Sequence, residues 1–134
     1  MNDIGVISAT LYAFYSKFGV RAWSEEDVPA TEDDGTELKP PYITFSIECP
    51  AWRESVLHHA KVFTRSESNK EAFDLAGKVL DAIGEGVTLK AVGAKGYVTL
   101  DPGTPLAQKQ PMDEDDIRVV HINLILGAIT ARSE

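Results

Sequence analysis

The sequence predicts a single α+β domain with a mostly antiparallel β-sheet and two main helices packed on it. Three observations support this fold class. Helical and strand patterns follow one another in the order α, β, β, β, α, β, β, β. Successive strands lie close enough in the sequence to form hairpins. Residues 1–134, of which 43% are hydrophobic, contain no repeat or dividing linker and are enough for one core.

The N-terminal element is predicted to be a helix over residues 3–18, with Gly19 as its stop signal. Apolar side chains recur there at spacings of three and four residues, which lines one helical face. A short strand is then expected at 20–23. The apolar face consists of Ile4, Ile7, Leu11, Phe14 and Phe18.

Two longer strands are predicted after an acidic loop at about residues 24–40. Residues 42–49 alternate between apolar and polar side chains, and Pro50 ends this strand. Residues 54–64 form the next predicted strand. The apolar side of the first strand consists of Ile43, Phe45, Ile47 and Cys49, and we expect Cys49 to be a small buried side chain.

A second helix is predicted to begin at Ser68, which has capping-box spacing to Glu71. Gly84 and Gly86 end it. Its expected apolar stripe consists of Phe73, Ala76, Leu80 and Ile83.

The C-terminal part is predicted to contain three strands. Strands at 87–92 and 96–100 are joined by a glycine turn. Residues 101–116, which are rich in proline, are expected to form a second long loop. The final strand covers 117–126.

Two of the predicted strands carry apolar side chains on both faces. Two helices do not easily cover both faces of one sheet, so either the N-terminal helix covers the second face or another subunit does. If a subunit does, the candidate contact residues are Leu57, Phe63, Ile117 and Val119.

The net charge of −8 is concentrated in the two predicted loops. Residues 24–37 hold seven acids and no base, and residues 111–116 hold four acids and no base. Such segments are either solvated loops or surfaces that meet a protein partner or line a passage for DNA. The candidate partner or lumen residues are Glu32, Asp33, Asp34, Asp113, Glu114, Asp115 and Asp116.

Motifs for catalysis or cofactor binding are not evident in the sequence. One cysteine excludes an internal disulfide and a cysteine-built zinc site. His58 and His59 are adjacent on a predicted strand and point to opposite faces, so they cannot chelate one metal together. No phosphate loop is complete, and no basic stripe indicates nucleic-acid binding. We expect no catalytic residue, cofactor or metal site.

No apolar run is long enough for a membrane-spanning helix, and the N-terminus has no secretion signal, so we expect synthesis inside the cell.

The middle and end of the chain resemble tail-completion, or tail-terminator, proteins of long-tailed bacteriophages and prophages. The resemblance covers roughly residues 41–126. A strand opening Pro41-Tyr42-Ile43-Thr44-Phe45 is followed by a strand closing Val62-Phe63-Thr64-Arg65-Ser66, and Phe63 stands where tryptophan is common in the family. The segment Lys70-Glu71-Ala72 then leads into the helix FDLAGKVLDAI, and an acidic stretch from Asp113 to Asp116 precedes a final strand with Asn123.

The resemblance implies a minor structural protein of the virion, made in the bacterial cytoplasm and located at the tail or head–tail junction. It implies a homo-oligomeric ring, possibly a hexamer, that caps the tail tube and contacts head-completion proteins. It implies no sequence-specific nucleic-acid binding and no membrane partner.

Two other readings remain open from the sequence. One is another ring component of the same particle, in the tube or in head completion. The other is a host α+β module that binds a ligand or peptide. A cleft that holds His58 or His59 against a carboxylate would point to a small enzyme instead.

Overall fold

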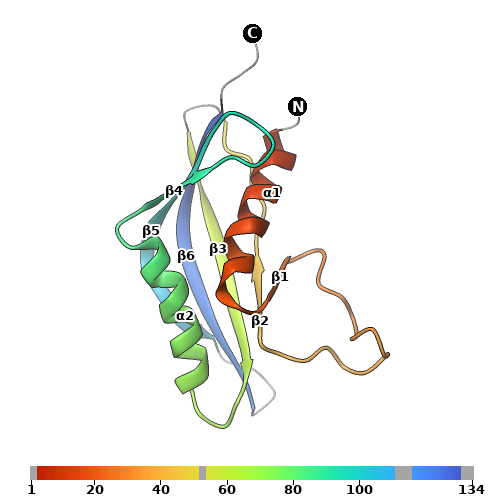
Figure 1. Cartoon of the computed structure of the whole chain (residues 1–134). Coiled ribbons are helices and arrows are strands. Elements are labelled where there is room, and N and C mark those ends of the chain that lie inside the picture. The colour runs from red at the N-terminus through yellow and green to blue at the C-terminus, as the bar shows by residue number, and fades with distance from the viewer. Residues whose placement is uncertain (1–2, 52–53, 111–115, 131–134) are drawn as a thin grey trace.

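Both helices lie on one face of a six-stranded sheet (Figure 1). The computed structural model describes residues 3–51, 54–110 and 116–130. In chain order the elements are α1 (Asp3–Tyr15), the 3-10 helix η1 (Ser16–Phe18), β1 (Arg21–Ser24), β2 (Tyr42–Phe45), β3 (Ser55–Arg65), α2 (Lys70–Ile83), β4 (Val87–Lys90), β5 (Gly96–Gln110) and β6 (Ile117–Thr130). The predicted α+β class and order of elements are confirmed.

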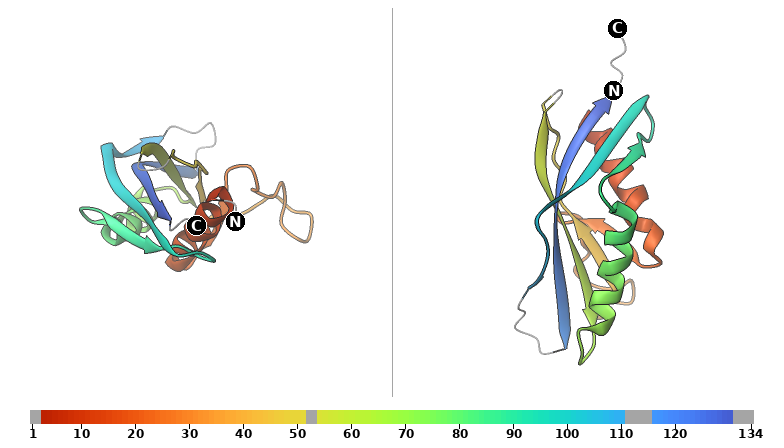
Figure 2. Two further views of the ribbon diagram at one scale, coloured as in Figure 1. Left: turned by 90° about the horizontal axis from the view of Figure 1, so that it is seen from above. Right: turned by 90° about the vertical axis from the view of Figure 1, so that its left-hand side faces the viewer.

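The sheet has the strand order β1-β2-β3-β6-β5-β4 and is strongly curled (Figure 2). All neighbouring strands are antiparallel except β1 and β2, which run parallel, with Arg21 beside Tyr42. A parallel pair requires a long connection that returns the chain to the same end of the sheet. Residues 25–41 make this connection without a helix, which explains why the acidic loop is so long.

The core lies between the two helices and the sheet face that they cover. Side chains of α1 pack into the same core as those of α2, so the N-terminal helix does not cover the second face of the sheet. Three of the five predicted α1 face residues are fully buried, whereas Ile4 is exposed and Phe18 is half-buried. The largest buried side chains include Tyr15, Phe45, Ile7, Leu11, Ile43, Leu124 and Leu126.

The second helix is where predicted, and two of its four predicted stripe residues, Ala76 and Ile83, are buried. Ala72, Leu75, Ala76, Val79 and Ile83 face the sheet, while Phe73 is 52% exposed and Leu80 is half-buried. Small alanine side chains let the helix approach the strands closely, and this leaves the larger Phe73 ring at the edge.

The predicted capping box does not form at the start of this helix. Asn69 is the N-cap residue, and the Ser68 hydroxyl accepts a bond from the Lys70 backbone N–H at 3.4 Å. Ser68 therefore lies one residue before the N-cap position of this helix.

Strand β2 ends earlier than predicted. Its regular pairing stops at Phe45, and the Ser46 backbone N–H still donates to the His59 carbonyl at 2.9 Å. Beyond this bond the alternation of faces is lost, so Cys49 is exposed rather than buried.

The predicted loop over 101–116 is wrong for residues 101–110, which continue strand β5. The strand pairs with β6 up to Pro102 and again from Ala107, with a register shift between them. This irregularity accommodates the two prolines, which cannot donate to a ladder. The Asn123 side-chain amide donates to the Pro105 carbonyl at 2.9 Å and thereby satisfies one acceptor in the bulge.

Replacing Gly103 with alanine is expected to destabilise the protein. A Cβ atom at this position would lie 2.8 Å from the backbone oxygen of Asn123 in the neighbouring strand. Because backbone atoms cannot move aside cheaply, we expect a loss of about 1–3 kcal/mol in the free energy of unfolding. Urea denaturation measures this loss. Gly77→Ala is the control, because a Cβ atom at Gly77 meets nothing within 4 Å; equal losses for both variants would contradict the close approach.

Candidate functional site

The sheet face away from the helices is the candidate functional surface, and we call it the outer face. Among the described residues no helix covers it (Figure 2). The strand register places side chains of β1, β2, β3 and β6 together on this face. They include Arg21, Trp23, Tyr42, Leu57, His59, Lys61, Phe63, Val119 and His121.

Aromatic rings form a row across the outer face. The Tyr42 ring stacks on the Phe63 ring, with centroids 4.8 Å apart, and meets the Trp23 ring edge-on at 5.6 Å. The Arg21 guanidinium lies over the Trp23 ring, 5.1 Å from its centroid. Aromatic and arginine side chains in such rows are typical of protein–protein contacts.

Of the four predicted subunit-contact residues, two are at least partly exposed to solvent and two are buried. The Leu57 side chain is 78% exposed on the outer face, and Phe63 is half-buried in the aromatic row. Ile117 and Val119 are only 8% and 0% exposed, because they pack within the chain itself. These two side chains therefore leave little exposed area for a partner to contact.

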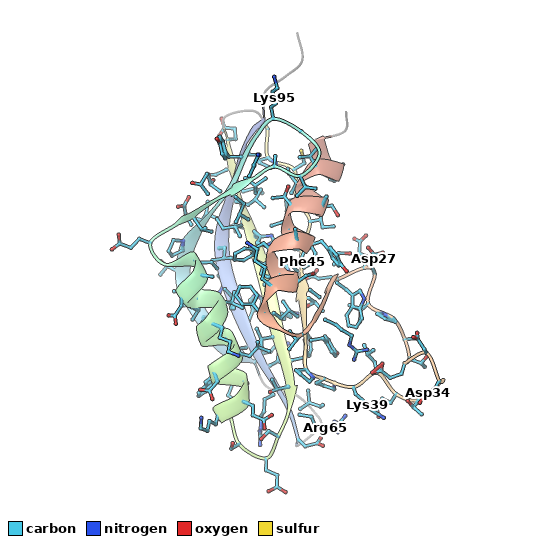
Figure 3. All side chains as sticks on the ribbon, viewed as in Figure 1. Asp27, Asp34, Lys39, Phe45, Arg65 and Lys95 are labelled. Atoms are coloured by element: carbon cyan, nitrogen blue, oxygen red, sulfur yellow. The ribbon has the colours of Figure 1, made fainter. Side chains whose placement is uncertain are left out.

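The connection between β1 and β2, residues 25–41, projects beyond the β1 edge of the sheet, and we call it the arm (Figures 1 and 3). Arg21 fastens its base. The guanidinium donates to both carboxylate oxygens of Glu32, at 2.7 and 2.8 Å, and to the Lys39 carbonyl at 2.7 Å. These bonds to Arg21, together with the Lys39 backbone N–H, lower the pKa of Glu32 to about 2. Both carboxylate oxygens of Glu32 are therefore bound within the chain.

Asp33 and Asp34 lie at the exposed tip of the arm. The tip is a tight turn in which Gly35 has a φ of 85° and donates its N–H to the Glu32 carbonyl at 3.0 Å. Asp34 accepts bonds from the Thr36 hydroxyl and backbone N–H, and these lower its pKa. Both carboxylates are exposed, and Asp34 points outward from an ordered turn (Figure 3).

The second acidic segment is described only at Asp116. Its carboxylate pairs with Arg65 at 2.5 Å, so this residue too is engaged within the chain. The predicted partner residues Asp113, Glu114 and Asp115 lie outside the described residues.

A hollow of about 410 Å³ lies between the arm base and strands β2 and β3 on the outer face. Glu25 and Val28 of the arm line one side, and Tyr42, Thr44, His59, Lys61 and Phe63 line the other. Nε2 of His59 pairs with the Glu25 carboxylate, whereas Lys61 forms no ion pair within the described part of the chain. Burial and the positive charges of His59 and Lys61 lower the pKa of the neighbouring His121.

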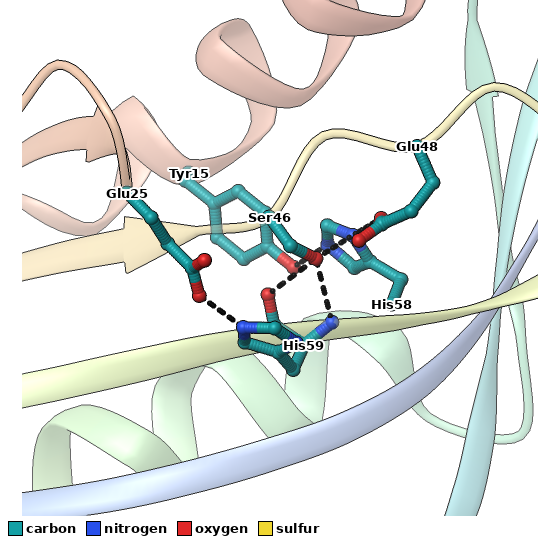
Figure 4. Close-up of polar contacts among 6 residues, drawn as sticks. All are labelled: Tyr15, Glu25, Ser46, Glu48, His58 and His59. Carbon is teal, nitrogen blue, oxygen red and sulfur yellow. Dashed lines mark hydrogen bonds and ion pairs between the residues drawn. The ribbon is translucent and has the colours of Figure 1, made fainter.

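A buried polar cluster around His58 lies on the opposite, core-facing side of β3 (Figure 4). The Tyr15 hydroxyl is 2.9 Å from Nε2 of His58, and Glu48 Oε1 is 3.0 Å from Nδ1. An ionised carboxylate can only accept, so Nδ1 donates to Glu48, while Nε2 bonds the Tyr15 hydroxyl. Burial, and secondarily the Glu48 charge, raise the pKa of Tyr15 well above its usual range.

The His58 cluster is not arranged for nucleophilic catalysis. The Ser46 hydroxyl lies 3.1 Å from Nδ1, the same nitrogen that faces Glu48. A base that activates serine needs a free lone pair toward the hydroxyl and its carboxylate on the other nitrogen. Here Nδ1 has no free lone pair and Nε2 faces Tyr15. The cluster instead fastens the end of β2 to β3 and α1.

We expect the free energy of unfolding to depend on pH because the pKa of the Glu48 carboxyl is lowered in the folded protein. Burial alone raises its pKa, but hydrogen bonds from His58 and Ser46 outweigh burial and hold the pKa below its ordinary 4.5. Its contribution is therefore complete above about pH 4.5 and is lost as the pH falls toward the lowered pKa. We expect Glu48→Gln to remove this acid-side loss, as measured by urea denaturation between pH 3 and 7. An unchanged acid-side slope in the variant would contradict the assignment.

A second pocket, of about 550 Å³, lies between the start of α1 and the ends of β1 and β2. Glu25, Glu26 and Glu48 line it together with Ile4, Phe45 and Ile47. Among the described residues no three metal-ligating side chains converge here or elsewhere. Nor does the described chain contain a helix long and apolar enough to cross a membrane.

Comparisons with known proteins support the fold. No protein-family model and no curated protein matches the chain. A solved structure of the virion of a native gene transfer agent particle contains a similar chain, with a TM-score of 0.66 and 15% sequence identity. The alignment covers 96% of this chain and 98% of the other. The likeness therefore extends over the whole chain and shows that the two proteins share this fold.

Proposed function

We propose that this protein is a structural component of a phage-like particle, where it forms a ring that ends the tail tube and contacts the head connector. The observation that carries the proposal is the whole-chain likeness to a protein in a gene transfer agent virion. The family resemblance of residues 41–126 refines this to a tail terminator. The protein acts through its surfaces, and its localisation is the virion at the tail or head–tail junction.

The ring contact uses the outer face. Leu57 and the row formed by Trp23, Tyr42 and Phe63 would lose their solvent exposure against a neighbouring copy, which supplies the cover that neither helix provides. A closed ring needs each copy to present one surface to the copy before it and a different surface to the copy after it. A hexamer is one such ring.

The exposed acids Asp33 and Asp34, with the segment 113–116, serve as partner or lumen surfaces. Carboxylates repel the DNA phosphates, so acidic walls let DNA pass without binding it. The proposed role requires no cofactor and no catalytic step.

Deletion of the gene from a particle-producing genome tests the terminator role. A tube without its terminator has no stop to growth and no joint to the head. We therefore expect free heads and tails of uncontrolled length in electron micrographs, and normal particles after the gene is restored. Normal particles from the deletion strain would overturn the proposal. Absence of all tubes, or of filled heads, would assign the protein instead to the tube or to head completion.

A further inference from the structure

We infer that the acidic arm of one copy of this chain inserts its tip into the hollow on the outer face of the next copy. This inference rests on the ring assembly proposed above and names the contact that holds it together. The occupant of the hollow is thus a second copy of the same chain, and the group that enters is the turn carrying Asp33 and Asp34.

The hollow is suited to an acidic segment with a small turn. Its floor is aromatic, from Tyr42 and Phe63, and Lys61 provides an ammonium group with no ion-pair partner among the described residues. The His59 imidazole also lines the hollow, and its Nε2 is already engaged by the Glu25 carboxylate. His121 lies beside them, with ring centroids of His59 and His121 5.2 Å apart. A carboxylate placed near Lys61 would therefore gain a charge partner that its own chain does not supply.

The tip of the arm is suited to enter such a hollow. The bonds within Glu32–Thr36 fix the turn before binding, so little conformational entropy is lost on docking. Asp33 and Asp34 make no ion pair within the described residues, and both are exposed. The arm therefore carries two exposed carboxylates on a preformed turn, of which Asp33 lies near enough to Arg21 to contribute to the raised pKa of that guanidinium.

The arm cannot place its tip in the hollow of its own chain without breaking its base. Glu25 and Val28, at the start of the arm, already line the hollow, and the arm then leads away past the β1 edge (Figures 1 and 2). Arg21 holds the two ends together through Glu32 and Lys39. Asp34 lies at the outer end of the arm, beyond the β1 edge, where an adjacent copy can meet it (Figure 3).

The contact between the arm of one copy and the hollow of the next is heterologous, because the two surfaces are different parts of the chain. Such contacts generate rings when the rotation between copies closes. Each copy then offers one arm and one hollow, and no arm or hollow stays empty in the closed ring.

Disulfide trapping tests the contact directly. In a Cys49→Ser background, which removes the single native thiol, one preparation carries Asp34→Cys and a second, of different tag length, carries Lys61→Cys. After oxidation with copper–phenanthroline we expect the mixed disulfide to exceed both same-variant dimers. A chain with both substitutions should give a ladder that ends at the ring size. Cross-linking no stronger than with a Lys78→Cys partner on the exposed side of α2 would overturn the inference.

A charge exchange gives an independent test. Lys61→Glu, and separately Asp33→Lys with Asp34→Lys, should each weaken association about tenfold or more, as measured by sedimentation. The two sets combined should restore association, because the opposite charges meet again. Lys78→Glu is the matched control with the same charge change. Unchanged thermal unfolding shows that the variants fold, and a failure of the combined set to restore association would contradict the pairing.

The outcomes separate this inference from the ring proposal. If the unmodified protein forms rings but neither trapping nor charge exchange has an effect, the arm contact is wrong and the ring stands. If the unmodified protein forms no oligomer, the ring proposal itself fails.

Discussion

Replacing Phe45 with alanine is expected to lower the free energy of unfolding by about 3–5 kcal/mol. The Phe45 side chain is 1% exposed, and its ring stacks on Tyr15 with centroids 5.0 Å apart. Truncation would leave a void at the point where α1, β2 and the His58 cluster meet, and the rigid neighbours could not collapse to fill it. Urea denaturation at neutral pH measures the change.

Phe73→Ala is the matched control for Phe45. The Phe73 ring is 52% exposed at the edge of α2, so its truncation removes much less buried area. We expect a loss of less than about 1 kcal/mol. If the two variants lose equal stability, the inner face of β2 has been assigned incorrectly.

Replacing Leu57 with aspartate is expected to break the ring while the chain stays folded. Leu57 is 78% exposed on the outer face, so the substitution has little effect on the isolated fold. In the ring it would bury a charge without a partner. If Leu57 anchors the contact, each interface loses about 2 kcal/mol, which corresponds to about a thirtyfold weaker association.

Light scattering at matched concentrations measures this effect. Phe73→Asp serves as the control, since it places the same charge on an exposed apolar position at the helix side of the sheet. We expect ring mass for the control and single-copy mass for Leu57→Asp. Ring mass for both would show that the outer face is not the subunit contact.

Local periodicity in the sequence was sufficient to predict most of the fold. The spacing of Ile7, Leu11 and Phe14 predicts the buried side of α1, and the alternation at Ile43 and Phe45 predicts the inner face of β2. The sequence predicts only the first part of β5, residues 96–100, because Pro102 and Pro105 favour a loop after it. Its strand is stabilised by the long partner β6, which local sequence does not reveal.

The candidate site was predictable only in part. Apolar side chains on both faces of a strand predict a second cover, and of the residues chosen on this ground Leu57 is exposed and Phe63 is half-buried. Val119 is buried within its own chain, because its burial in the curled sheet depends on neighbours that are distant in sequence. The Tyr15–His58 contact joins residues 43 positions apart, so spacing could not predict it. The polar residue Ser46, which directly follows β2, hints at a polar contact in this region but does not identify its partners.

The arm shows why charge runs need structural context. All seven acids of residues 24–37 look equivalent in the sequence, yet Glu32 is bound by Arg21 and Glu25 by His59. Asp33 and Asp34 are left at the tip. The parallel pairing of β1 with β2 explains the length of the arm, and this pairing depends on tertiary structure.

Ring formation is tested by the mass of the purified protein across a concentration series, together with negative-stain images of the same samples. Light scattering gives the number of copies, and the images show their arrangement. We predict a mass of several copies and closed rings with a central hole. A single-copy mass, or a two-fold dimer, at every concentration would contradict ring formation.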